Sequence, residues 1–321
     1  MKKKEVVLLT GCAGFIGSNL LRYFLKNKIR VLGIDNFKLG SFKNIAKLKE
    51  NKNFFFKKID ISDLSKLDNF LKSFVKIYRI KTVWHLAANS EIKNGFKDPD
   101  NDYKNTFLTT FNLIKIAQKH KFDNFIFASS SAIFGKLTNL KIKETSGPLL
   151  PISTYGAMKL ASEGIISAAK ESFLKKIFIF RFPNVVGSPS THGVIHDFIN
   201  KLKSNPLKLN VLGNGKQQKI YMHVDDLIHS MIYVFKNSKD PISLFNIGPN
   251  DKGVTVNFIA KEVTKYFKKN KKIIYQKKSI GWVGDVAKFS YSVNKFNKLG
   301  SQIKISSKDA IIRAIKELIN K

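Results

Sequence analysis

Short apolar runs alternate along the chain with longer stretches in which apolar residues recur every three or four positions. The first pattern predicts β-strands and the second predicts amphipathic helices. The strand-like runs cover 5–10, 29–35, 54–60, 81–88, 124–131, 176–182 and 243–248, and the helix-like stretches cover 15–27, 63–78, 106–120 and 153–173. Since parallel strands are joined by helical crossovers, this alternation predicts an α/β fold with a doubly wound parallel sheet.

The regular alternation fades after about residue 183, where Gly, Pro and Asn interrupt the pattern. We therefore expect two domains. The sheet domain is predicted over 1–180 with a returning segment at about 219–248, and a smaller lobe is predicted mainly over 181–321.

The sequence "LLTGCAGFIGSNL" at 8–20 follows the first predicted strand and starts the first predicted helix. In this context Gly11 permits a tight turn, Gly14 lets the backbone approach a pyrophosphate, and Gly17 lets helix and sheet pack closely. The free N–H groups of the helix start bind phosphate. Asp35, which ends the second strand, is placed to accept a hydrogen bond from a ribose 2′-hydroxyl. Its charge would repel a 2′-phosphate, so the pattern predicts NAD rather than NADP.

A candidate catalytic pair follows in "STYGAMKLASE", where Tyr155 and Lys159 lie one helical turn apart. A tyrosine pKa of about 10 must fall by about 3 units for the phenol to act as a base near neutral pH. An ammonium at about 4 Å contributes up to about 4 kcal/mol at an effective dielectric of 20, so we expect Lys159 to lower the pKa of Tyr155. The alternative is a chance pair on an amphipathic helix.

Three serines end the strand "FIFASSS", at the sheet edge where ligands bind in parallel sheets. We predict that Ser130 orients substrate and relays a proton. Ser131 is the second choice, and Ser129 is assigned to packing or capping.

Seven segments together, "TGCAGFIGS", "HLAANS", "ASSSAIFG", "YGAMK", "RFPNVVG", "HGVIHDFI" and "YMHVDD", resemble the extended short-chain dehydrogenase/reductases. Within them the chain is most similar to the NAD-dependent nucleotide-sugar epimerases of the UDP-glucose 4-epimerase type. The resemblance implies a Rossmann domain that binds NAD, a smaller substrate-binding lobe, and a homodimer formed through helices at about 99–120 and 151–172.

The resemblance also implies roles for individual residues. The NAD-binding residues would be Gly11, Gly14, Phe15, Ile16, Gly17, Asp35, Asn36, Asp60, Ile61, Leu86, Ala87, Ala88, Asn105, Tyr155, Lys159 and Phe182. The residues that contact a nucleotide-diphosphate sugar would be Ser90, Ser130, Ser131, Asn184, Val194, Lys219, Trp282 and Asp285.

Three positions depart from the family pattern: Phe134 replaces a common tyrosine, and Lys219 and Ile280 replace common arginines. Lysine lacks the bidentate fork that arginine offers a phosphate. The contacts to the diphosphate and base are therefore the part of the resemblance that these residues support least.

Composition adds a formal net charge of +34, with 57 Lys and Arg against 23 Asp and Glu. The basic residues are dispersed, and only 268–278 forms a cluster, so we expect no specific nucleic-acid partner.

No apolar run approaches the ~20 residues of a membrane span. The lone cysteine, Cys12, is typical of a reducing compartment and predicts a cytoplasmic protein. His192 and His196 have ligand spacing without a third ligand, so no metal is expected.

These features predict an enzyme that inverts a sugar C4 hydroxyl through a transient ketone. A nucleotide-sugar 4,6-dehydratase or decarboxylase shares the first oxidation, but it commonly needs Thr-Asp-Glu where this chain has Ser130-Ser131-Ala132. A third possibility is a non-catalytic NAD- or RNA-binding scaffold on the same fold.

Overall fold

The computed structural model describes residues 3–92, 95–137, 141–190, 192–267, 272–277, 286 and 290–320. The chain forms two compact units, each built from separate stretches of sequence. Unit 1 comprises Met1–Ile133, Pro151–Arg181 and Val234–Phe245, and unit 2 comprises Phe134–Leu150, Phe182–Tyr233 and Asn246–Lys321.

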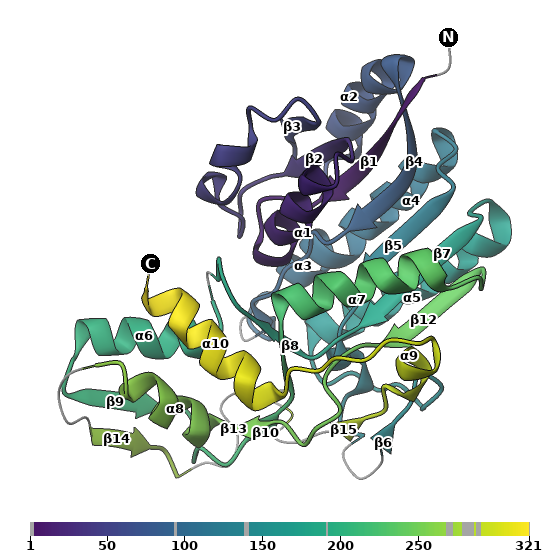
Figure 1. Cartoon of the computed structure of the whole chain (residues 1–321). Helices are drawn as coiled ribbons and strands as arrows, with labels where there is room; N and C mark the ends of the chain where they lie inside the picture. Colours follow the sequence, from purple (N-terminus) through teal and green to yellow (C-terminus); the bar gives the residue numbers. More distant parts are fainter. Residues whose placement is uncertain are drawn as a thin grey trace. The chain divides into compact units, whose positions relative to one another are not determined.

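Unit 1 contains a seven-stranded sheet in the order β12-β7-β5-β4-β1-β2-β3 (Figure 1). Its strands are β1 (Lys4–Thr10), β2 (Val31–Asp35), β3 (Phe54–Lys58), β4 (Tyr78–His85), β5 (Asn124–Ala128), β7 (Lys176–Arg181) and β12 (Ile242–Asn246). Each of the seven predicted runs supplies one strand. The pairings from β7 across to β3 are parallel, which confirms the doubly wound fold. The strand order reverses between β1 and β4, and ligands bind at such a switch point.

Helices cover both faces of this sheet (Figure 1). On one face, Trp84 of β4 packs against Phe24 of α1 (Phe15–Lys26) and Phe235 near the end of α7 (Val224–Asn237), each with ring centroids 5.5 Å apart. The other face carries α2 (Leu64–Ile77), α4 (Leu108–Lys119) and α5 (Thr154–Ser172). Strand side chains alternate between faces, so neighbours of Trp84 in sequence point toward α4.

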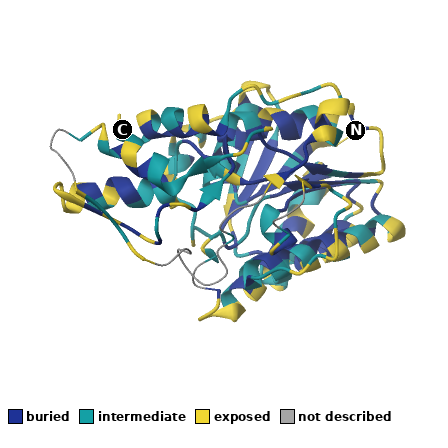
Figure 2. Cartoon of the chain, turned by 90° about the horizontal axis from the view of Figure 1, so that it is seen from below, coloured by how far each residue is buried: buried dark blue, intermediate teal, exposed yellow. Residues whose placement is uncertain are grey.

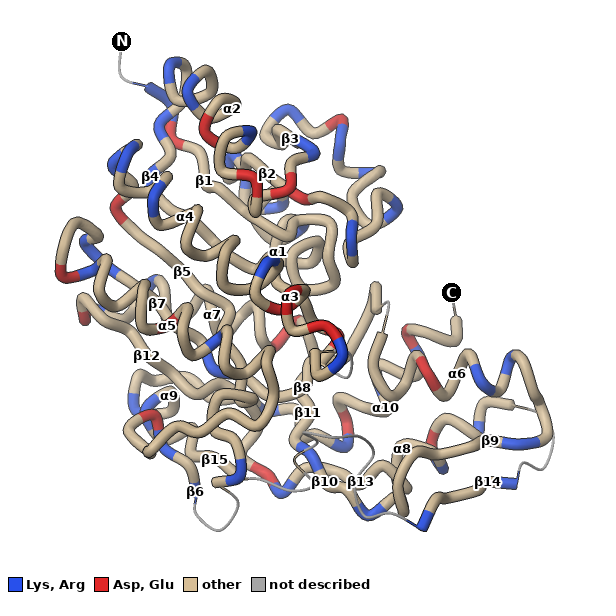
Figure 3. The backbone as a smooth tube through the Cα atoms, turned by 180° about the vertical axis from the view of Figure 1, so that it is seen from behind, with Lys and Arg blue, Asp and Glu red and all other residues tan. Residues whose placement is uncertain are grey.

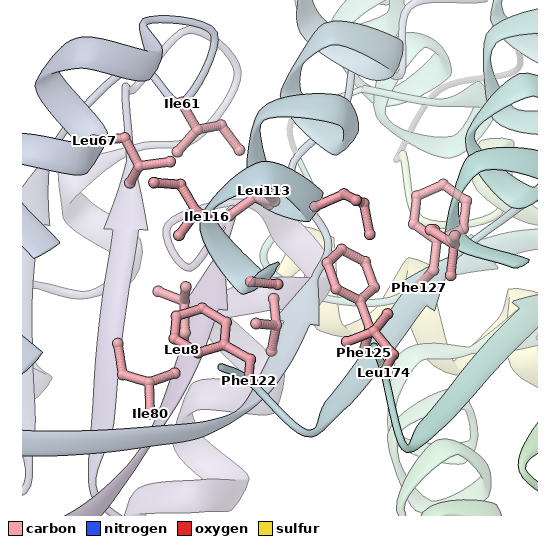
Figure 4. Close-up of a cluster of buried hydrophobic side chains, with 14 of the residues drawn as sticks. Leu8, Ile61, Leu67, Ile80, Leu113, Ile116, Phe122, Phe125, Phe127 and Leu174 are labelled. Atoms are coloured by element: carbon pink, nitrogen blue, oxygen red, sulfur yellow. The ribbon is translucent and has the colours of Figure 1, made fainter. Parts of the chain in front are cut away.

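The main core of unit 1 lies between the sheet and α2, α4 and α5. Figure 4 shows Leu8 and Phe125 of the sheet facing Leu113 and Leu67 of the helices, and all four are fully buried. Burying such a side chain contributes about 1.5–3 kcal/mol. Figure 2 shows the result, with buried strands and helices that are exposed on their outer sides.

A short irregular region links β4 to α4. It comprises α3 (Pro99–Asp102) and a π-helical turn at Tyr103–Phe107. Short 3-10 turns occur at Phe42–Asn44, Ala46–Leu48 and Ser131–Phe134. π-helical turns are rare and occur frequently at functional sites.

Unit 2 has four two-stranded ladders and four helices among the described residues. The ladders pair β6 (Lys141–Ile142) with β15 (Ser290–Tyr291), β8 (Asn184–Val186) with β11 (Tyr221–His223), β9 (Lys208–Val211) with β14 (Lys272–Tyr275) and β10 (Gln218–Lys219) with β13 (Val254–Thr255). The helices are α6 (Val194–Ser204), α8 (Val256–Thr264), α9 (Asn294–Lys298) and α10 (Ser307–Ile319). These counts refer to the described residues, and the first part of α7 also belongs to this unit.

Figure 3 shows Lys and Arg distributed along the surface elements of each unit. Over the ranges that the structure describes, no helix combines the length and apolarity needed to cross a bilayer.

Candidate active site

The glycine loop joins β1 to α1 in a conformation that only glycine fits. Gly11 has φ +69°, and a Cβ there would lie 2.8 Å from the backbone nitrogen of Ala87. A Cβ on Gly17 would lie 1.9 Å from the carbonyl oxygen of Gly11. The loop therefore packs directly against the carboxyl end of β4, where the Leu86 amide donates to the Thr10 carbonyl at 3.3 Å.

Helix α1 presents its amino end at this loop. Its N-cap is Gly14, which makes no side-chain cap bond, and no acidic residue lies in the first turn. The first N–H groups of a helix have no acceptor within the helix. Those near Phe15 and Ile16 therefore suit an anionic group such as a pyrophosphate.

The Asp35 carboxylate lies beside the same loop. Its Oδ2 accepts a hydrogen bond from the Ala13 amide at 2.9 Å, and its Oδ1 accepts one from the Phe37 amide at 2.8 Å. Burial raises the pKa of Asp35, while these backbone bonds act in the opposite direction. Each carboxylate oxygen accepts more than one hydrogen bond, so both retain capacity for ribose hydroxyls. The donor set of this edge fits NAD.

Further predicted cofactor residues gather at the same edge. The Asn36 amide donates to Asp60 Oδ2 at 3.1 Å, and Lys38 Nζ donates to Asn105 Oδ1 at 3.0 Å. Burial favours a higher pKa for Asp60, but hydrogen bonds from Ser62 and Asn36 lower it below the ordinary value. Ile61 is buried, whereas Leu86, Ala87 and Ala88, which directly follow β4, are partly exposed.

The three catalytic candidates meet in unit 1. Helix α5 carries Tyr155 and Lys159, and its N-cap Ser153 accepts a bond from the Gly156 amide, which fixes where the helix begins. The Ser130 side chain lies close enough to the Tyr155 phenol to act on its pKa, which it lowers. Lys159, which is 2 % exposed, donates from Nζ to the Ala128 carbonyl at 2.6 Å. Its Nζ lies 4.6 Å from the ring centroid of Phe127 and 5.7 Å from that of Tyr155.

The protein's own groups do not give the Tyr155 pKa that the sequence argument expected. Burial raises the pKa of Tyr155 to about 12, opposed by the Ser130 hydrogen bond and reinforced by the charge of Asp102. Burial also lowers the pKa of Lys159 to about 7, opposed by the charge of Glu163. The expected contribution of Lys159 to a lower Tyr155 pKa is not seen in the chain by itself, because desolvation acts on both groups and weakens the ammonium as a charge partner.

A buried ion pair supports this site, and the sequence analysis did not find it. Glu163, one turn beyond Lys159, accepts hydrogen bonds from Arg181 at 2.7 and 3.0 Å and from the Ser129 hydroxyl at 2.5 Å. The Ser129 hydroxyl therefore binds the buried ion pair, whereas the side chain of the neighbouring Ser130 acts on Tyr155. The only signal in the sequence was one charged residue in each of two largely apolar elements, Glu163 in α5 and Arg181 in β7.

Unit 2 holds the remaining described substrate candidates. Asn184 in β8 donates to the Ile220 carbonyl at 3.4 Å, which brings it beside Lys219 of β10. Val194 begins α6 and packs on the unit 2 core, and Phe182 is buried. Ser90 and Ser131 belong to unit 1, where both are partly exposed. Trp282, Asp285 and Ile280 lie outside the described residues.

Comparison with known proteins identifies the family whose members this chain resembles. A family model described as "NAD dependent epimerase/dehydratase family" matches residues 7–248. A putative UDP-glucose 4-epimerase of Methanocaldococcus jannaschii is 28% identical over 98% of this chain and 99% of its own length. A dTDP-D-glucose 4,6-dehydratase of Dictyostelium discoideum is 29% identical over 76% of this chain and 58% of its own length. A crystal structure of UDP-glucuronic acid 4-epimerase from Bacillus cereus, with UDP-glucuronic acid and NAD, superposes with a TM-score of 0.83 at 26% identity, covering 98% and 99% of the two chains.

Proposed function

Because the chain belongs to the NAD dependent epimerase/dehydratase family and uses NAD, we propose that it is a nucleotide-sugar 4-epimerase, with UDP-glucose and UDP-galactose as the first substrates to test. The observation that carries the proposal is the grouping of three residues in unit 1: Tyr155 and Lys159 lie one turn apart on α5, and the Ser130 side chain acts on Tyr155 by lowering its pKa. The similarity to a putative UDP-glucose 4-epimerase along almost the whole chain supports it.

The proposed NAD site consists of unit 1 residues, with the exception of Phe182. The amino end of α1, around Gly14, Phe15 and Ile16, binds the pyrophosphate, and Asp35 accepts the ribose hydroxyls. Its charge disfavours a 2′-phosphate at that position. Of the remaining predicted NAD residues, Asn36, Asp60, Ile61, Leu86, Ala87 and Ala88 follow the carboxyl ends of β2 to β4, whereas Asn105 lies in the π-helical turn and Tyr155 and Lys159 lie on α5. Phe182 of unit 2 is proposed for the nicotinamide side. NAD, held by these residues, would supply reversible hydride transfer at the sugar carbon.

The protein's own side chains remove and return the hydroxyl proton that accompanies hydride transfer. Tyr155 takes the proton of the C4 hydroxyl at its phenol oxygen, and Ser130 orients that hydroxyl and relays the proton. A phenol with a pKa of about 12 is a poor base near neutral pH, so ionisation needs a further positive charge. The oxidised nicotinamide ring carries such a charge, and Lys159 adds its own when protonated. When the hydride returns to the other face, Tyr155 gives the proton back.

Dehydration is the second candidate, since one relative is a dTDP-D-glucose 4,6-dehydratase. Expelling the C6 hydroxyl needs another acid or base beside the catalytic serine. The chain has Ser131 and Ala132 there, with the Ala132 amide donating to Ser130 Oγ at 3.1 Å. Epimerisation needs one oxidation and its reversal, which the described groups support without that carboxylate.

Product mass distinguishes these reactions. Purified protein is incubated with UDP-, GDP-, dTDP- and CDP-sugars, and products are identified by mass spectrometry and NMR. We expect a C4 epimer of unchanged mass without accumulation of NADH. A product lighter by one water, or by carbon dioxide, refutes the epimerase proposal, and no turnover in the whole panel favours a scaffold.

Replacement of Tyr155 tests the assigned base. Tyr155→Phe keeps the ring and removes the proton acceptor, so turnover is expected to fall by about 10²- to 10⁴-fold while NAD still copurifies. Tyr266→Phe, a change at an exposed tyrosine of unit 2, is the matched control. A Tyr155→Phe variant that keeps more than about half of the activity contradicts the assignment.

The proposed substrate contacts are Ser90, Ser130 and Ser131 in unit 1 and Asn184, Val194 and Lys219 in unit 2. Trp282 and Asp285 remain proposals from the family resemblance alone. Lys219 replaces a common arginine, so its single ammonium offers the diphosphate a point charge.

We also propose a C2 homodimer, and an exposed aromatic stripe supports it. Tyr103, Phe107 and Phe111 follow one face of the π-helical turn and α4, with ring centroids 6.2 and 6.3 Å apart. Tyr103 is 47% and Phe111 38% exposed. A contiguous apolar surface of this kind is typical of an interaction site. The cytoplasm is the proposed compartment, because Cys12 is the chain's one cysteine.

A further inference from the structure

A buried carboxyl lies beside the proposed catalytic tyrosine, and the mechanism above does not use it. Asp102 ends α3, immediately before the π-helical turn, and its side chain is completely buried. Its Oδ1 accepts a hydrogen bond from Asn89 Nδ2 at 2.6 Å. Its Oδ2 has no hydrogen-bond partner among the residues that the structure describes. Burying a carboxyl oxygen without a hydrogen-bond partner costs free energy of folding. Such a group in a native protein therefore needs a structural or functional explanation.

The carboxyl of Asp102 contacts both ends of the segment that follows β4. At the first end, Asn89 binds Oδ1, and its backbone amide also donates to Thr106 Oγ1 at 3.2 Å. At the second end, Gly95 packs so closely on Oδ2 that a Cβ there would lie 2.3 Å from it. Ser90, a proposed substrate contact, lies within this segment. The hydrogen bond between Asn89 and the buried Asp102 carboxyl is therefore one residue away from Ser90.

The same segment is tied to the helix that carries Tyr155. Thr154 Oγ1, one residue before the tyrosine, donates to the Gly95 carbonyl at 3.0 Å. The hypothetical Cβ of Gly95 would also lie 3.4 Å from Thr154 Oγ1, so the Asp102 carboxyl, Gly95 and Thr154 share one small volume. Asp102 is fully buried, and its charge raises the pKa of Tyr155, the residue that follows Thr154.

The charged and titratable groups around Asp102 give its ionisation few counter-charges. Asp98 at the start of its own helix is a like charge, and burial together with Asp98 raises the pKa of Asp102, opposed by the Asn89 hydrogen bond. On α5, the titratable group that interacts with the Asp102 charge is Tyr155. The Lys159 ammonium of the same helix donates its hydrogen bond to the Ala128 carbonyl. Lys104 of the π-helical turn is exposed.

We propose that Asp102 is a positioning residue that anchors the Ser90 segment to the start of α5, and that its negative charge opposes the ionisation of Tyr155. The inference rests on the proposed role of Tyr155 as the base. It divides into an anchoring part, which depends on the hydrogen bond to Asn89, and an electrostatic part, which depends on the charge.

Two substitutions separate these parts. Asp102→Asn keeps an oxygen for Asn89 and removes the charge, so the acidic limb of the pH–activity profile is expected to move to lower pH by about half a unit to one unit, with KM unchanged. Asn89→Ala keeps the charge and removes the anchor, so KM for the nucleotide sugar is expected to rise. Asp100→Asn, an exposed acid on the same helix, is the matched control and changes neither.

A titration that needs no turnover keeps the inference separate from the proposed function. The ultraviolet absorbance change of tyrosinate formation is measured for the chain and for Asp102→Asn, each against its Tyr155→Phe counterpart. We expect the Tyr155 signal to begin at lower pH in Asp102→Asn. An unchanged Tyr155 titration overturns the electrostatic part, and an unchanged KM in Asn89→Ala overturns the anchoring part. Absence of activity toward every nucleotide sugar instead refutes the proposed function and leaves the titration result intact.

Discussion

The buried pair of Glu163 and Arg181 gives the sharpest test of how unit 1 is stabilised. The two side chains are 7% and 5% exposed, and two hydrogen bonds, at 2.7 and 3.0 Å, join the guanidinium to both carboxylate oxygens. Glu163→Gln keeps the shape of the side chain and one acceptor oxygen but removes the charge. Arg181 then remains buried without its counter-ion, and Ser129 faces a neutral partner.

Breaking a buried ion pair by removing one partner costs about 3–5 kcal/mol. Since one acceptor oxygen remains in Gln, we expect the free energy of unfolding to fall by about 3 kcal/mol. Domains are commonly stable by about 5–15 kcal/mol, so this is a large fraction of the total. The loss of the Glu163 charge also moves the pKa of Lys159 further down.

Urea unfolding followed by circular dichroism measures this change. Glu171→Gln is the control, because Glu171 is 71% exposed and its bond to Lys170 lies at the surface, where an ion pair contributes at most about 1 kcal/mol. The double variant Glu163→Leu with Arg181→Met is expected to recover much of the loss, since it leaves no buried charge. A loss below about 1 kcal/mol in Glu163→Gln would refute the argument.

Three further predictions concern the loop, the aromatic stripe and pH. Gly17→Ala places a methyl group 1.9 Å from the Gly11 carbonyl oxygen, so the purified variant should contain little NAD and melt at a lower temperature; normal NAD content contradicts this. Phe111→Glu introduces a charge into the aromatic stripe, and light scattering should report the monomer mass, whereas an unchanged dimer would place the interface elsewhere. The pKa of Lys159 is about 7 in the folded chain against an ordinary value of 10.5, so between these values the unfolded chain binds more protons and stability should rise with pH. Lys159→Met should flatten that rise in unfolding measurements, and an equally steep rise in the variant would assign it to other groups.

The apolar pattern predicted the sheet well because strand and helix periods are local properties. All seven runs form the expected strands, and α1 begins at Phe15, directly after the glycine loop. The close contact between Gly11 and Ala87 follows from the same logic, since the carboxyl ends of neighbouring parallel strands meet at one edge.

Properties that depend on burial were outside the reach of the sequence. In "DPDND", Asp102 is indistinguishable from an ordinary acid near a helix start, yet it is completely buried and contacts Asn89. The direction of the Tyr155 pKa was missed for the same reason, since spacing brings Lys159 near but does not reveal the desolvation of both groups. Glu163 and Arg181 lie 18 residues apart, and only the fold brings them together.

The last strand of the sheet has a consequence for the way the chain is made. Strand β12 and the end of α7 leave the ribosome after β7. The end of α7 supplies Phe235, whose ring centroid lies 5.2 Å from that of Phe178 in β7. The Pro241 carbonyl, just before β12, accepts a hydrogen bond from the Ile177 amide at 2.9 Å. At about 5–20 residues per second, the roughly 60 intervening residues take on the order of 3–12 s to synthesise. During that interval the apolar edge of β7 is open to pairing with other chains. A chain that stops after Arg181 would keep this edge permanently, and it is expected to aggregate rather than yield a free-standing nucleotide-binding module.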